Sequence, residues 1–339
     1  MSKRTIQLAR GSSCLLLLAS LASCASNHAA LHPAGPRAQA IANLLVLFCA
    51  VSSAVYLIVI AFLLWSLFRR RRRDAAAERD ARSEQRSWRL ISAGVALTIV
   101  TLITLALADF AVQRRLSAHP ADAMRIVLTG HQYWWEVEYD HADPSQRVRT
   151  ANEIHIPVHR PVEFILSSRD VIHSFWLPSL MGKKDLIPGH TNTEVVIASR
   201  PGTFTGQCAE FCGLQHAQMR LTLTADAPQD FERWRQQQLT EAAAPAGERE
   251  RRGQQVFMSS TCILCHTIQG TPAGATIGPD LTHLASRGTI GAGTLSNTPA
   301  NLSSWILEPQ RLKPGAMMPA TALPAEDLAA LTAYLGSLR

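Results

Sequence analysis

The first third of the sequence contains two long stretches of apolar residues, Ile41 to Phe68 and Leu90 to Val112. Each is longer than the roughly 20 residues with which an α-helix crosses the hydrocarbon core of a membrane. Only Asp109 brings a charge into either stretch. Helices buried in a soluble core are the alternative, but these stretches have no polar face and arginines flank both of them. The pattern therefore predicts transmembrane helices at 41–68 and 90–112, joined by a loop at 69–89.

A different pattern follows between residues 124 and 226, where short apolar runs of β type alternate with turn residues. The runs are Arg125–Leu128, Trp134–Tyr139, Glu153–Ile156, Val162–Leu166, Thr193–Ala198 and Met219–Leu223. Short strands at such close spacing leave no room for crossover helices and indicate a β-sandwich or barrel. We place this all-β domain at 120–235.

The C-terminal part of the chain shows helical periodicity. Residues 236–247 are rich in Gln, Ala and Pro and predict a linker. From Glu248 on, apolar residues recur at helical spacing around Val256, from Leu302 to Leu307 and from Leu328 to Leu338. The sequence thus predicts an all-α domain at 248–339.

The N-terminus has the pattern of a signal peptide at 1–23, with basic residues, then leucines, then small residues. Leu21-Ala22-Ser23-Cys24 resembles a bacterial lipobox, in which the cysteine is lipidated after cleavage before it. A spare cysteine near an ordinary cleavage site is the alternative. We expect a lipoprotein acylated at Cys24, followed by an outer segment at 24–40.

The net charge of +7 is concentrated in the loop 69–89, where nine arginines face four acidic residues. A short loop this rich in arginine stays in the cytoplasm. Both termini and both outer domains are therefore expected on the periplasmic face of a bacterial inner membrane. The basic charge therefore indicates this membrane topology, with membrane lipid as a partner. It does not indicate a nucleic-acid partner.

The motif Cys262-Ile263-Leu264-Cys265-His266 is C-x-x-C-H, in which two thiols bond to a haem and the adjacent histidine reaches its iron. A methionine further on is the expected sixth ligand, because Met/His ligation raises the potential and suits electron transfer. Met317 and Met318 are both available.

Around these motifs the end of the chain resembles class I cytochrome c, which implies a covalent haem c. The family's P-G-x-x-M-P ligand loop matches Pro314 to Pro319 and implies Met318 as the ligand, with Met317 left to packing. Gly278-Pro279-Asp280-Leu281 looks like the family's G-P-x-L turn. There the carbonyl of Pro279 would accept the proton of His266 and fix the orientation of its ring.

A second group of metal-binding residues lies between 208 and 219. It combines two thiols, an imidazole and a thioether, from Cys208, Cys212, His216 and Met219. Copper accepts all three donor types, whereas zinc has little use for methionine. Two cysteines four residues apart allow both sulfurs to bridge two coppers, and His173 is the candidate for the second histidine. A Cys208–Cys212 disulfide is the alternative, but it leaves His216 and Met219 unexplained.

This constellation resembles the Cu-A site of cytochrome c oxidase subunit II, from the first span to about Ala225, and implies an all-β cupredoxin-like sandwich. The ligands it implies are the bridging cysteines Cys208 and Cys212, the histidines His173 and His216, the weak ligand Met219 and the main-chain carbonyl of Glu210. The family also uses the glutamate carboxylate for a magnesium ion shared with subunit I, which implies that role for Glu210.

Two positions depart from the family. Its aromatic motif G-H-Q-W-x-W contains the tryptophan that takes electrons from cytochrome c, but here Tyr133 stands at that place and is followed by Trp134 and Trp135. All three are candidates for accepting electrons. Before the second span the family carries a glutamate associated with proton uptake, where this chain has Gln85 beside Glu84. We do not assign that role to Glu84.

A two-span subunit II fused to cytochrome c resembles the caa(3)-type bacterial oxidases. The resemblance implies that electrons enter haem c, pass to the copper pair and leave for haem a in subunit I, which also holds Cu-B and reduces oxygen to water. Subunit III and an external donor, such as a soluble cytochrome c or quinol:cytochrome c reductase, are the further implied partners. Nothing in this chain resembles the multi-histidine helices of an oxygen-reducing centre. We therefore expect an electron-transfer subunit of a cytochrome-c oxidase, a translocase, without catalysis of its own.

Two other functions remain open at this point. The chain could deliver electrons to a Cu-A-containing nitric oxide reductase, because the reaction is chosen in the partner subunit. It could also be a free-standing, membrane-tethered redox carrier, although two spans are more than a tether requires.

Overall fold

The computed structural model describes residues 28–70 and 81–339 of the chain. The predicted signal peptide, the predicted lipidation of Cys24 and the middle of the arginine-rich loop lie outside the described residues. The chain divides into a helical unit at Gln39–Ala118 and a second compact unit that holds the residues up to Ala38 and from His119 onward.

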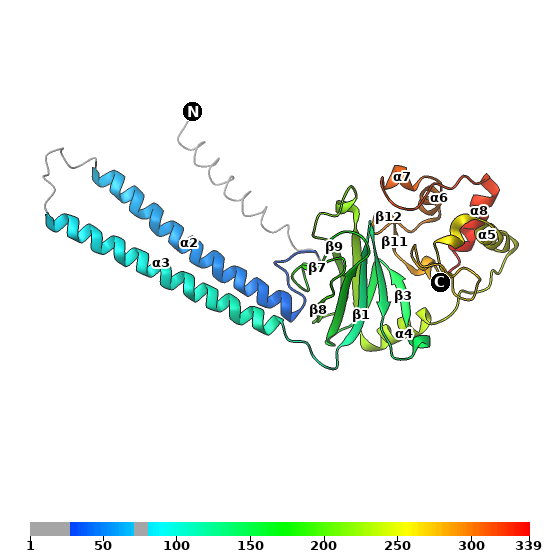
Figure 1. The fold of residues 1–339 in the computed structure, drawn as a ribbon, viewed down its shortest axis with the longest axis horizontal. Helices are drawn as coiled ribbons and strands as arrows, with labels where there is room; N and C mark the ends of the chain where they lie inside the picture. Colours follow the sequence, from blue (N-terminus) through cyan, green and yellow to red (C-terminus); the bar gives the residue numbers. More distant parts are fainter. Residues whose placement is uncertain (1–27, 71–80) are drawn as a thin grey trace, which may run out of the picture. The chain divides into compact units, whose positions relative to one another are not determined.

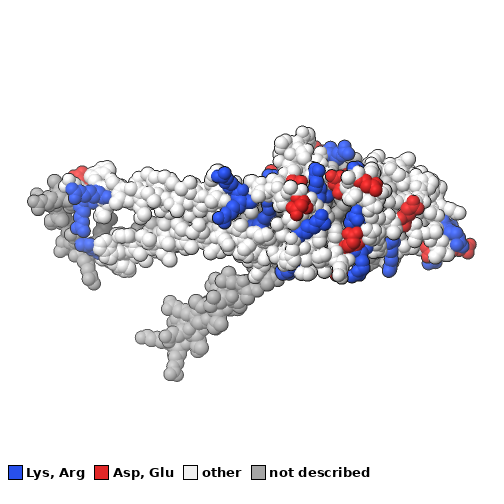
Figure 2. Space-filling model, turned by 90° about the horizontal axis from the view of Figure 1, so that it is seen from below, with Lys and Arg blue, Asp and Glu red and all other residues white. Residues whose placement is uncertain are grey.

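The helical unit is a pair of long helices, α2 (Pro36–Arg70) and α3 (Ala81–Leu116) (Figure 1). Within Pro36–Arg69 and Glu84–Leu116, the most apolar 18-residue windows have mean hydropathies of 2.7 and 2.4, and no residue of either window is buried. Figure 2 shows one face of the pair as an uncharged band with basic side chains at both ends. By length and composition both helices can cross a membrane, which is the environment that exposed leucine, isoleucine and phenylalanine side chains require.

The β domain is a sandwich of two five-stranded sheets (Figure 1). The first sheet has the order β3-β2-β1-β5-β8, with β1 (Met124–His131), β2 (Trp134–Tyr139), β3 (Val148–Ala151), β5 (Val162–Ser168) and β8 (Asn192–Val196). The second has the order β4-β10-β9-β6-β7, with β4 (Glu153–Pro157), β6 (His173–Trp176), β7 (Lys184–Leu186), β9 (Gly202–Cys208) and β10 (Arg220–Asp226). Only the pairs β1–β5 and β4–β10 are parallel.

The core of the sandwich follows from alternation along the strands, since successive side chains of a strand point to opposite faces. Ile126 and Leu128 of β1, Phe164 of β5 and Phe204 of β9 are fully buried between the sheets. Helix α4 (Pro228–Gln238) follows β10 and buries Phe231 against the same core. This packing fixes the ends of β6, β9 and β10, where the predicted copper ligands lie.

The C-terminal part is helical. Its helices are α5 (Glu248–Ser259), α6 (Pro299–Leu307), α7 (Pro309–Leu312) and α8 (Ala325–Leu335), with a small hairpin of β11 (Thr289–Ile290) and β12 (Leu295–Ser296). Short 3-10 helices, two in the β domain and two here, are η2 (Pro144–Gln146), η3 (His216–Gln218), η4 (Thr261–Leu264) and η5 (Leu284–Ser286). Phe257 of α5 packs against Tyr334 of α8 in its core. Two apolar helices, a β-sandwich and a helical C-terminal region are thus the predicted fold class, which is confirmed.

Candidate functional site

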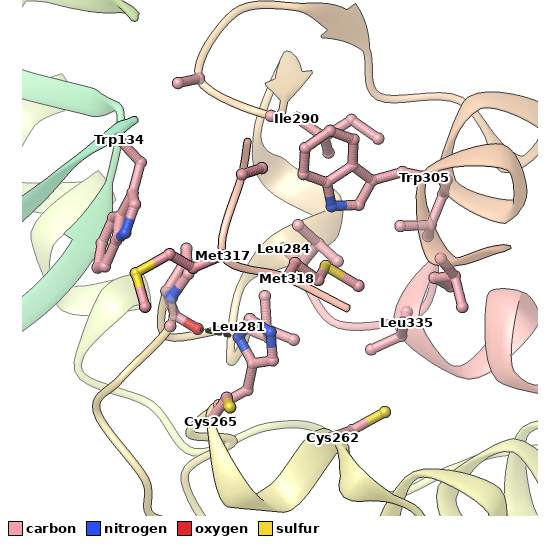
Figure 3. Close-up of a pocket in the computed structure, with 18 of the residues that line it drawn as sticks. Trp134, Cys262, Cys265, Leu281, Leu284, Ile290, Trp305, Met317, Met318 and Leu335 are labelled. Carbon is pink, nitrogen blue, oxygen red and sulfur yellow. Dashed lines mark hydrogen bonds between the residues drawn. The ribbon is translucent and has the colours of Figure 1, made fainter. Parts of the chain in front are cut away.

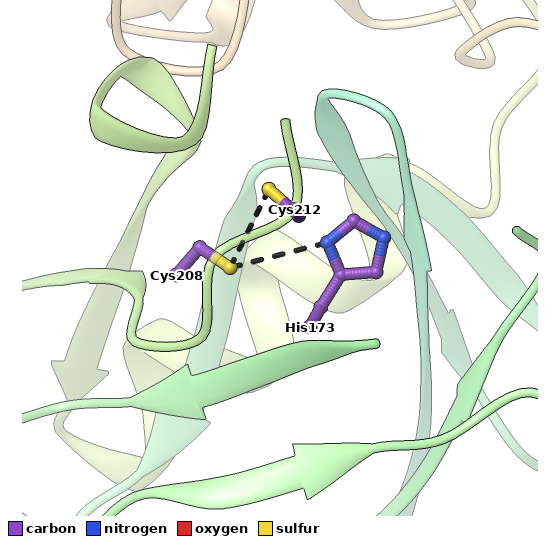
Figure 4. Close-up of side chains that lie close together, drawn as sticks. All are labelled: His173, Cys208 and Cys212. Atoms are coloured by element: carbon purple, nitrogen blue, oxygen red, sulfur yellow. Dashed lines mark hydrogen bonds between the residues drawn. The ribbon is translucent and has the colours of Figure 1, made fainter. Parts of the chain in front are cut away.

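The predicted copper ligands come together where three strands of the second sheet end (Figure 4). Strand β9 ends at Cys208, and the chain returns through Cys212 and η3 to Met219, directly before β10. Strand β6 begins at His173 and pairs with β9 in a register that sets Phe175 opposite Cys208. This register brings His173 beside the loop although 35 residues separate it from Cys208.

The donor atoms form one compact cluster. The two cysteine sulfurs are 3.9 Å apart. Nδ1 of His173 lies 3.9 Å from the sulfur of Cys208, and Nδ1 of His216 lies 3.8 Å from that of Cys212. The sulfur of Met219 is 3.9 Å from Cys212, and the carbonyl oxygen of Glu210 is 3.2 Å from the sulfur of Cys208. Contacts of 3.2 to 3.9 Å thus connect donor atoms of all six residues implied as ligands, and those of His173, Cys208 and Cys212 all lie within 4.8 Å of one another.

This arrangement fits metal ions. Both cysteines are free and buried. Ions bound at roughly 2.0 Å from nitrogen and roughly 2.3 Å from sulfur need donor atoms at separations of this size. Two thiols, two imidazoles and a fully buried thioether form a soft donor set that suits copper.

The electrostatics of the two thiols differ. A hydrogen bond from Cys212 lowers the pKa of Cys208 to about 3, against the opposite effect of burial, and His173 contributes in the same direction as Cys212. The hydrogen bond with Cys208, then burial and the charge of Cys208, raise the pKa of Cys212. Metal binding would release thiol protons, because metals bind thiolates.

Asp170 holds the ring of His173, and sequence reasoning gave it no role. Its Oδ1 lies 2.8 Å from Nε2 of His173, which leaves Nδ1 to face Cys208. Asp170 also accepts hydrogen bonds from the backbone of Val171 and Gln132, both at 2.7 Å. Burial would raise the pKa of Asp170, but these hydrogen bonds outweigh it and lower the pKa. A carboxylate that orients a ligating imidazole is a common outer partner of metal sites.

The C-x-x-C-H motif opens onto a cavity of about 380 Å³ (Figure 3). Cys262, Cys265 and His266 line one wall, and Met317 and Met318 line the opposite part. The remaining lining is mostly apolar and includes Leu281, Leu284, Ile290, Trp305, Ile306, Leu331 and Leu335.

The imidazole of His266 has the hydrogen bond that the G-P-x-L turn predicts. Nδ1 of His266 lies 2.7 Å from the carbonyl oxygen of Pro279, so the other ring nitrogen is the one left for iron. Burial lowers the pKa of His266, and the Pro279 carbonyl acts in the opposite direction. Gly278 is needed here because a Cβ atom on it would lie 2.7 Å from Cε1 of the ring.

The residues around the cavity fit a haem. Two thiols, an imidazole and a thioether are placed on the walls of an apolar space, which is the donor set of a c-type haem. Arg287 also lines the cavity, and its buried Nε atom has no hydrogen-bond partner within the described part of the chain. A haem propionate is an acceptor of the charge and geometry that such a guanidinium nitrogen requires.

The two methionines point in different directions. Met317 extends toward Trp134 and is 78% exposed, whereas Met318 lies on the side of Trp305 and is only partly exposed (Figure 3). This difference favours Met318 as the iron ligand, in line with the register of the ligand loop.

The three aromatic residues at 133–135 occupy different environments. Trp134 lines the cavity beside Met317 and stacks on His131 with ring centroids 4.3 Å apart. Trp135 points to the other face of β2, is fully buried, and contacts the ring of His173 edge-on at 6.1 Å. The hydroxyl of Tyr133 accepts a hydrogen bond from the backbone of Leu214. Leu214 lies in the segment that runs from Cys208 to Met219, which we call the copper loop.

The carboxylate of Glu210 forms an ion pair with Lys183 at 3.2 Å, and its side chain is partly exposed. Within residues 28–70 and 81–339, the group of His, Cys, Asp or Glu side chains placed to hold a metal is His173 with Cys208 and Cys212. A magnesium role for Glu210 stays a prediction.

Comparisons with known proteins match the chain to two families. Residues 142–225 match the family described as the periplasmic domain of cytochrome c oxidase subunit II, and residues 250–339 match the cytochrome c family. Cytochrome c oxidase subunit 2 of Alkalihalophilus pseudofirmus is 35% identical over 320 residues, which cover 92% of this chain and 91% of that protein. The protein of the same description from Bacillus subtilis is 29% identical over 250 residues, or 71% of this chain and 69% of its own length.

Among solved structures, the periplasmic domain of subunit II of cytochrome oxidase from Bradyrhizobium japonicum aligns with 35% of this chain and 95% of its own length. The sequence identity is 28% and the TM-score is 0.33.

Proposed function

The chain belongs to the family of cytochrome c oxidase subunit II and carries a cytochrome c domain, and from this premise we propose that it is the electron-input subunit of a caa(3)-type oxidase. In this role it takes electrons from an external donor at its own haem c. It passes them through a Cu-A copper pair to haem a of subunit I, where oxygen is reduced to water.

One observation carries the proposal. Gln132 lines the haem cavity, and its side-chain amide donates a 2.6 Å hydrogen bond to the carbonyl oxygen of Cys212. Gln132, on the wall of the haem cavity, is thus hydrogen-bonded to the main chain of Cys212 in the copper site. Two redox sites in such contact form a relay, because single electrons pass efficiently only between closely spaced centres.

The residues of the copper site have separate roles in this proposal. Cys208 and Cys212 would hold the copper pair as its shared cysteine ligands, with His173 and His216 as one histidine ligand for each copper. Met219 would be a weak ligand, and Glu210 would contribute its main-chain carbonyl. At the second site Cys262 and Cys265 would carry the haem, and His266 and Met318 would bind its iron while the Pro279 carbonyl orients the histidine. When bound, the haem and the copper pair would supply two one-electron couples.

Strand β2 offers the route between the sites. Because neighbouring side chains of a strand point to opposite faces, Trp134 faces the haem cavity while Trp135 reaches His173. We propose that these two residues conduct electrons, with Tyr133 closing the space between the ligand loops of the two domains.

The rest of the assembly follows from the family. Membership of a haem-copper oxidase subunit family implies a subunit I partner. We further propose a subunit III, a magnesium ion at Glu210, acylation of Cys24, and both redox domains on the periplasmic face of the inner membrane. The chain would not catalyse oxygen reduction alone, and proton translocation would reside in its partner.

Purification of the tagged full-length chain from its native membranes tests this function. We expect a large subunit to accompany it and reduced bands of haem c and haem a to appear together. A chain that is purified alone, without haem a, would support the free-standing carrier. Haem b with nitric oxide reduction would support the nitric oxide reductase.

A substitution tests the copper assignment in the same preparation. Cys208→Ser should abolish the near-infrared band of the copper pair and stop oxygen consumption, while haem c stays reducible. Cys49→Ser is the matched control, because this cysteine lies in α2. A near-infrared band that survives Cys208→Ser would contradict the bridging role.

A further inference from the structure

Lys313 is a buried cation in a loop between the two redox sites. It precedes the methionine ligand loop, lines the haem cavity, and is only 2% exposed. Burial lowers the pKa of its ammonium group to about 7, and the charge of Cys212 acts in the opposite direction. A lysine is rarely buried to this extent unless its donors are satisfied.

All three donors of the ammonium group find acceptors. Nζ donates to the carbonyl oxygens of Tyr133 at 2.9 Å, Gln218 at 2.9 Å and Gly291 at 2.7 Å. An ammonium group has three N–H bonds, so no donor is left over. Tyr133 lies in the turn between β1 and β2, which we call the aromatic turn, and Gln218 directly precedes Met219 in the copper loop. Gly291 lies in the loop of the β11–β12 hairpin of the cytochrome domain.

Two of these acceptors therefore belong to the copper domain and one to the cytochrome domain. Without the copper domain, Lys313 would keep a single carbonyl partner and return to water. We propose that Lys313 is the positioning residue that holds the cytochrome domain, with its haem-ligand loop, against the copper loop. This inference rests on the proposed function, because it concerns the transfer of electrons from haem c to the copper pair.

Neighbouring contacts support the same placement. The backbone N–H of Arg220, at the end of the copper loop, donates to the carbonyl of Ala292 at 3.1 Å. Gly293 has a φ of +77°, and a Cβ atom on it would lie 3.0 Å from Cβ of Arg220. The hairpin loop thus fits tightly against the copper loop on one side of Lys313. On the other side, Gly315 lies close to Tyr133 and Leu214. The methionine ligand loop, Pro314 to Pro319, therefore covers the aromatic turn.

The test compares Lys313→Met with Arg311→Met in the purified oxidase complex. Methionine keeps the volume of the lysine stem but leaves three carbonyls without a donor. Arg311 is an exposed cation two residues away that pairs with Glu308, so it serves as the matched control. A photoactivated ruthenium dye injects one electron at haem c. The haem c band and the near-infrared copper band then report its transfer.

In Lys313→Met the transfer from haem c to copper should be at least about tenfold slower, the factor that corresponds to one hydrogen bond with a charged group. Loss of a buried positive charge lowers the midpoint potential of a nearby centre, so the potentials of haem c and of the copper pair are measured with the rate. The driving force that they give should change too little to explain the slower transfer. Exchange of the Arg220 amide hydrogen should accelerate by about tenfold or more, because this amide reports contact between the domains. Arg311→Met should match the wild type in all three measurements.

Two results would overturn the proposal: wild-type transfer and wild-type Arg220 exchange in a fully loaded Lys313→Met protein, or a shifted haem potential that accounts for the slower transfer. If Lys313→Met does not load haem, Lys313→Gln replaces it. The amide retains two donors and should give intermediate values. Wild-type values in this variant would again contradict the proposal.

The failure of the proposed function looks different. If the wild-type protein passes no electron from haem c to copper, the relay is wrong, whatever Lys313 does. The exchange rate at Arg220 still reports, in that case, whether Lys313 holds the two domains together.

Discussion

Nε2 of His173 lies 2.8 Å from a carboxylate oxygen of Asp170, and Nδ1 of the same ring faces the sulfur of Cys208 at 3.9 Å. The two contacts sit on opposite sides of one imidazole. Asp170 therefore selects which nitrogen is presented to the copper site.

Asp170→Asn should weaken copper binding by about tenfold to a hundredfold, as is common when the carboxylate partner of a ligating histidine is lost. An asparagine keeps the shape but supplies no negative charge. Copper titration of the copper-depleted chain, followed by the near-infrared band, measures the change. Asp185→Asn on the neighbouring strand β7 is the control. Equal affinities for the wild type and Asp170→Asn would show that the contact has no part in metal binding.

Met219→Leu should keep both coppers but shift their midpoint potential and slow oxygen consumption. The thioether is fully buried beside Cys212, and leucine fills the same space without a donor atom. A redox titration of the copper band together with turnover measurements checks this. An unchanged copper spectrum combined with unchanged turnover would remove Met219 from the ligand set.

Met318→Leu should lower the midpoint potential of haem c by on the order of 0.1 V, because Met/His ligation raises the potential. Met317→Leu, its neighbour in the same loop, should leave the potential unchanged. Redox titration of the haem c band distinguishes the two. The opposite outcome would assign the ligand to Met317.

His155 should stabilise the β domain at acidic pH, and this contribution to the free energy of unfolding should be lost as the pH rises. It lies 2.7 Å from Asp226 and 3.1 Å from Glu153 and stacks on Trp234. Burial would lower the pKa of His155, but the two carboxylates outweigh it and raise the pKa. The stabilisation is therefore complete below the ordinary histidine pKa of about 6.5 and is lost as the pH rises through the folded-state pKa.

His155→Phe keeps the stacking and removes both hydrogen bonds. We expect the free energy of unfolding to fall by about 2 kcal/mol at acidic pH, with a smaller difference at alkaline pH. Denaturant unfolding of the purified chain at a series of pH values measures it, with the exposed His190→Phe as control. A destabilisation that is independent of pH would mean that the charge of His155 contributes nothing.

The sequence was most informative where ligands are close together in the chain. Cys208 to Met219 and Cys262 to His266 each lie in one segment, so spacing alone indicated their chemistry. Strands β6 and β9 were not predicted: β6 is too short for a clear alternation, and β9 contains glycine and threonine with Phe204 as its only large apolar residue. Both nevertheless bear copper-site residues.

The sequence pattern could not predict contacts between segments that are distant in the chain. Lys313 lies shortly before the predicted ligand Met318, but its hydrogen-bond partner Tyr133 is 180 residues away. Asp170 lies only three residues before His173, and a carboxylate at that spacing was an available signal. Its role depends on the turn between β5 and β6, which sets the carboxylate against the ring.

The covered aromatic turn at Tyr133 has a kinetic consequence. In the proposed relay the donor and the acceptor are on one chain, so the step from haem to copper would be unimolecular, with an effective concentration set by the fold instead of by the supply of a diffusing protein. Dilution or added salt would then slow only the loading of haem c from outside, and the inner step would proceed at the same rate in a dilute or a crowded solution.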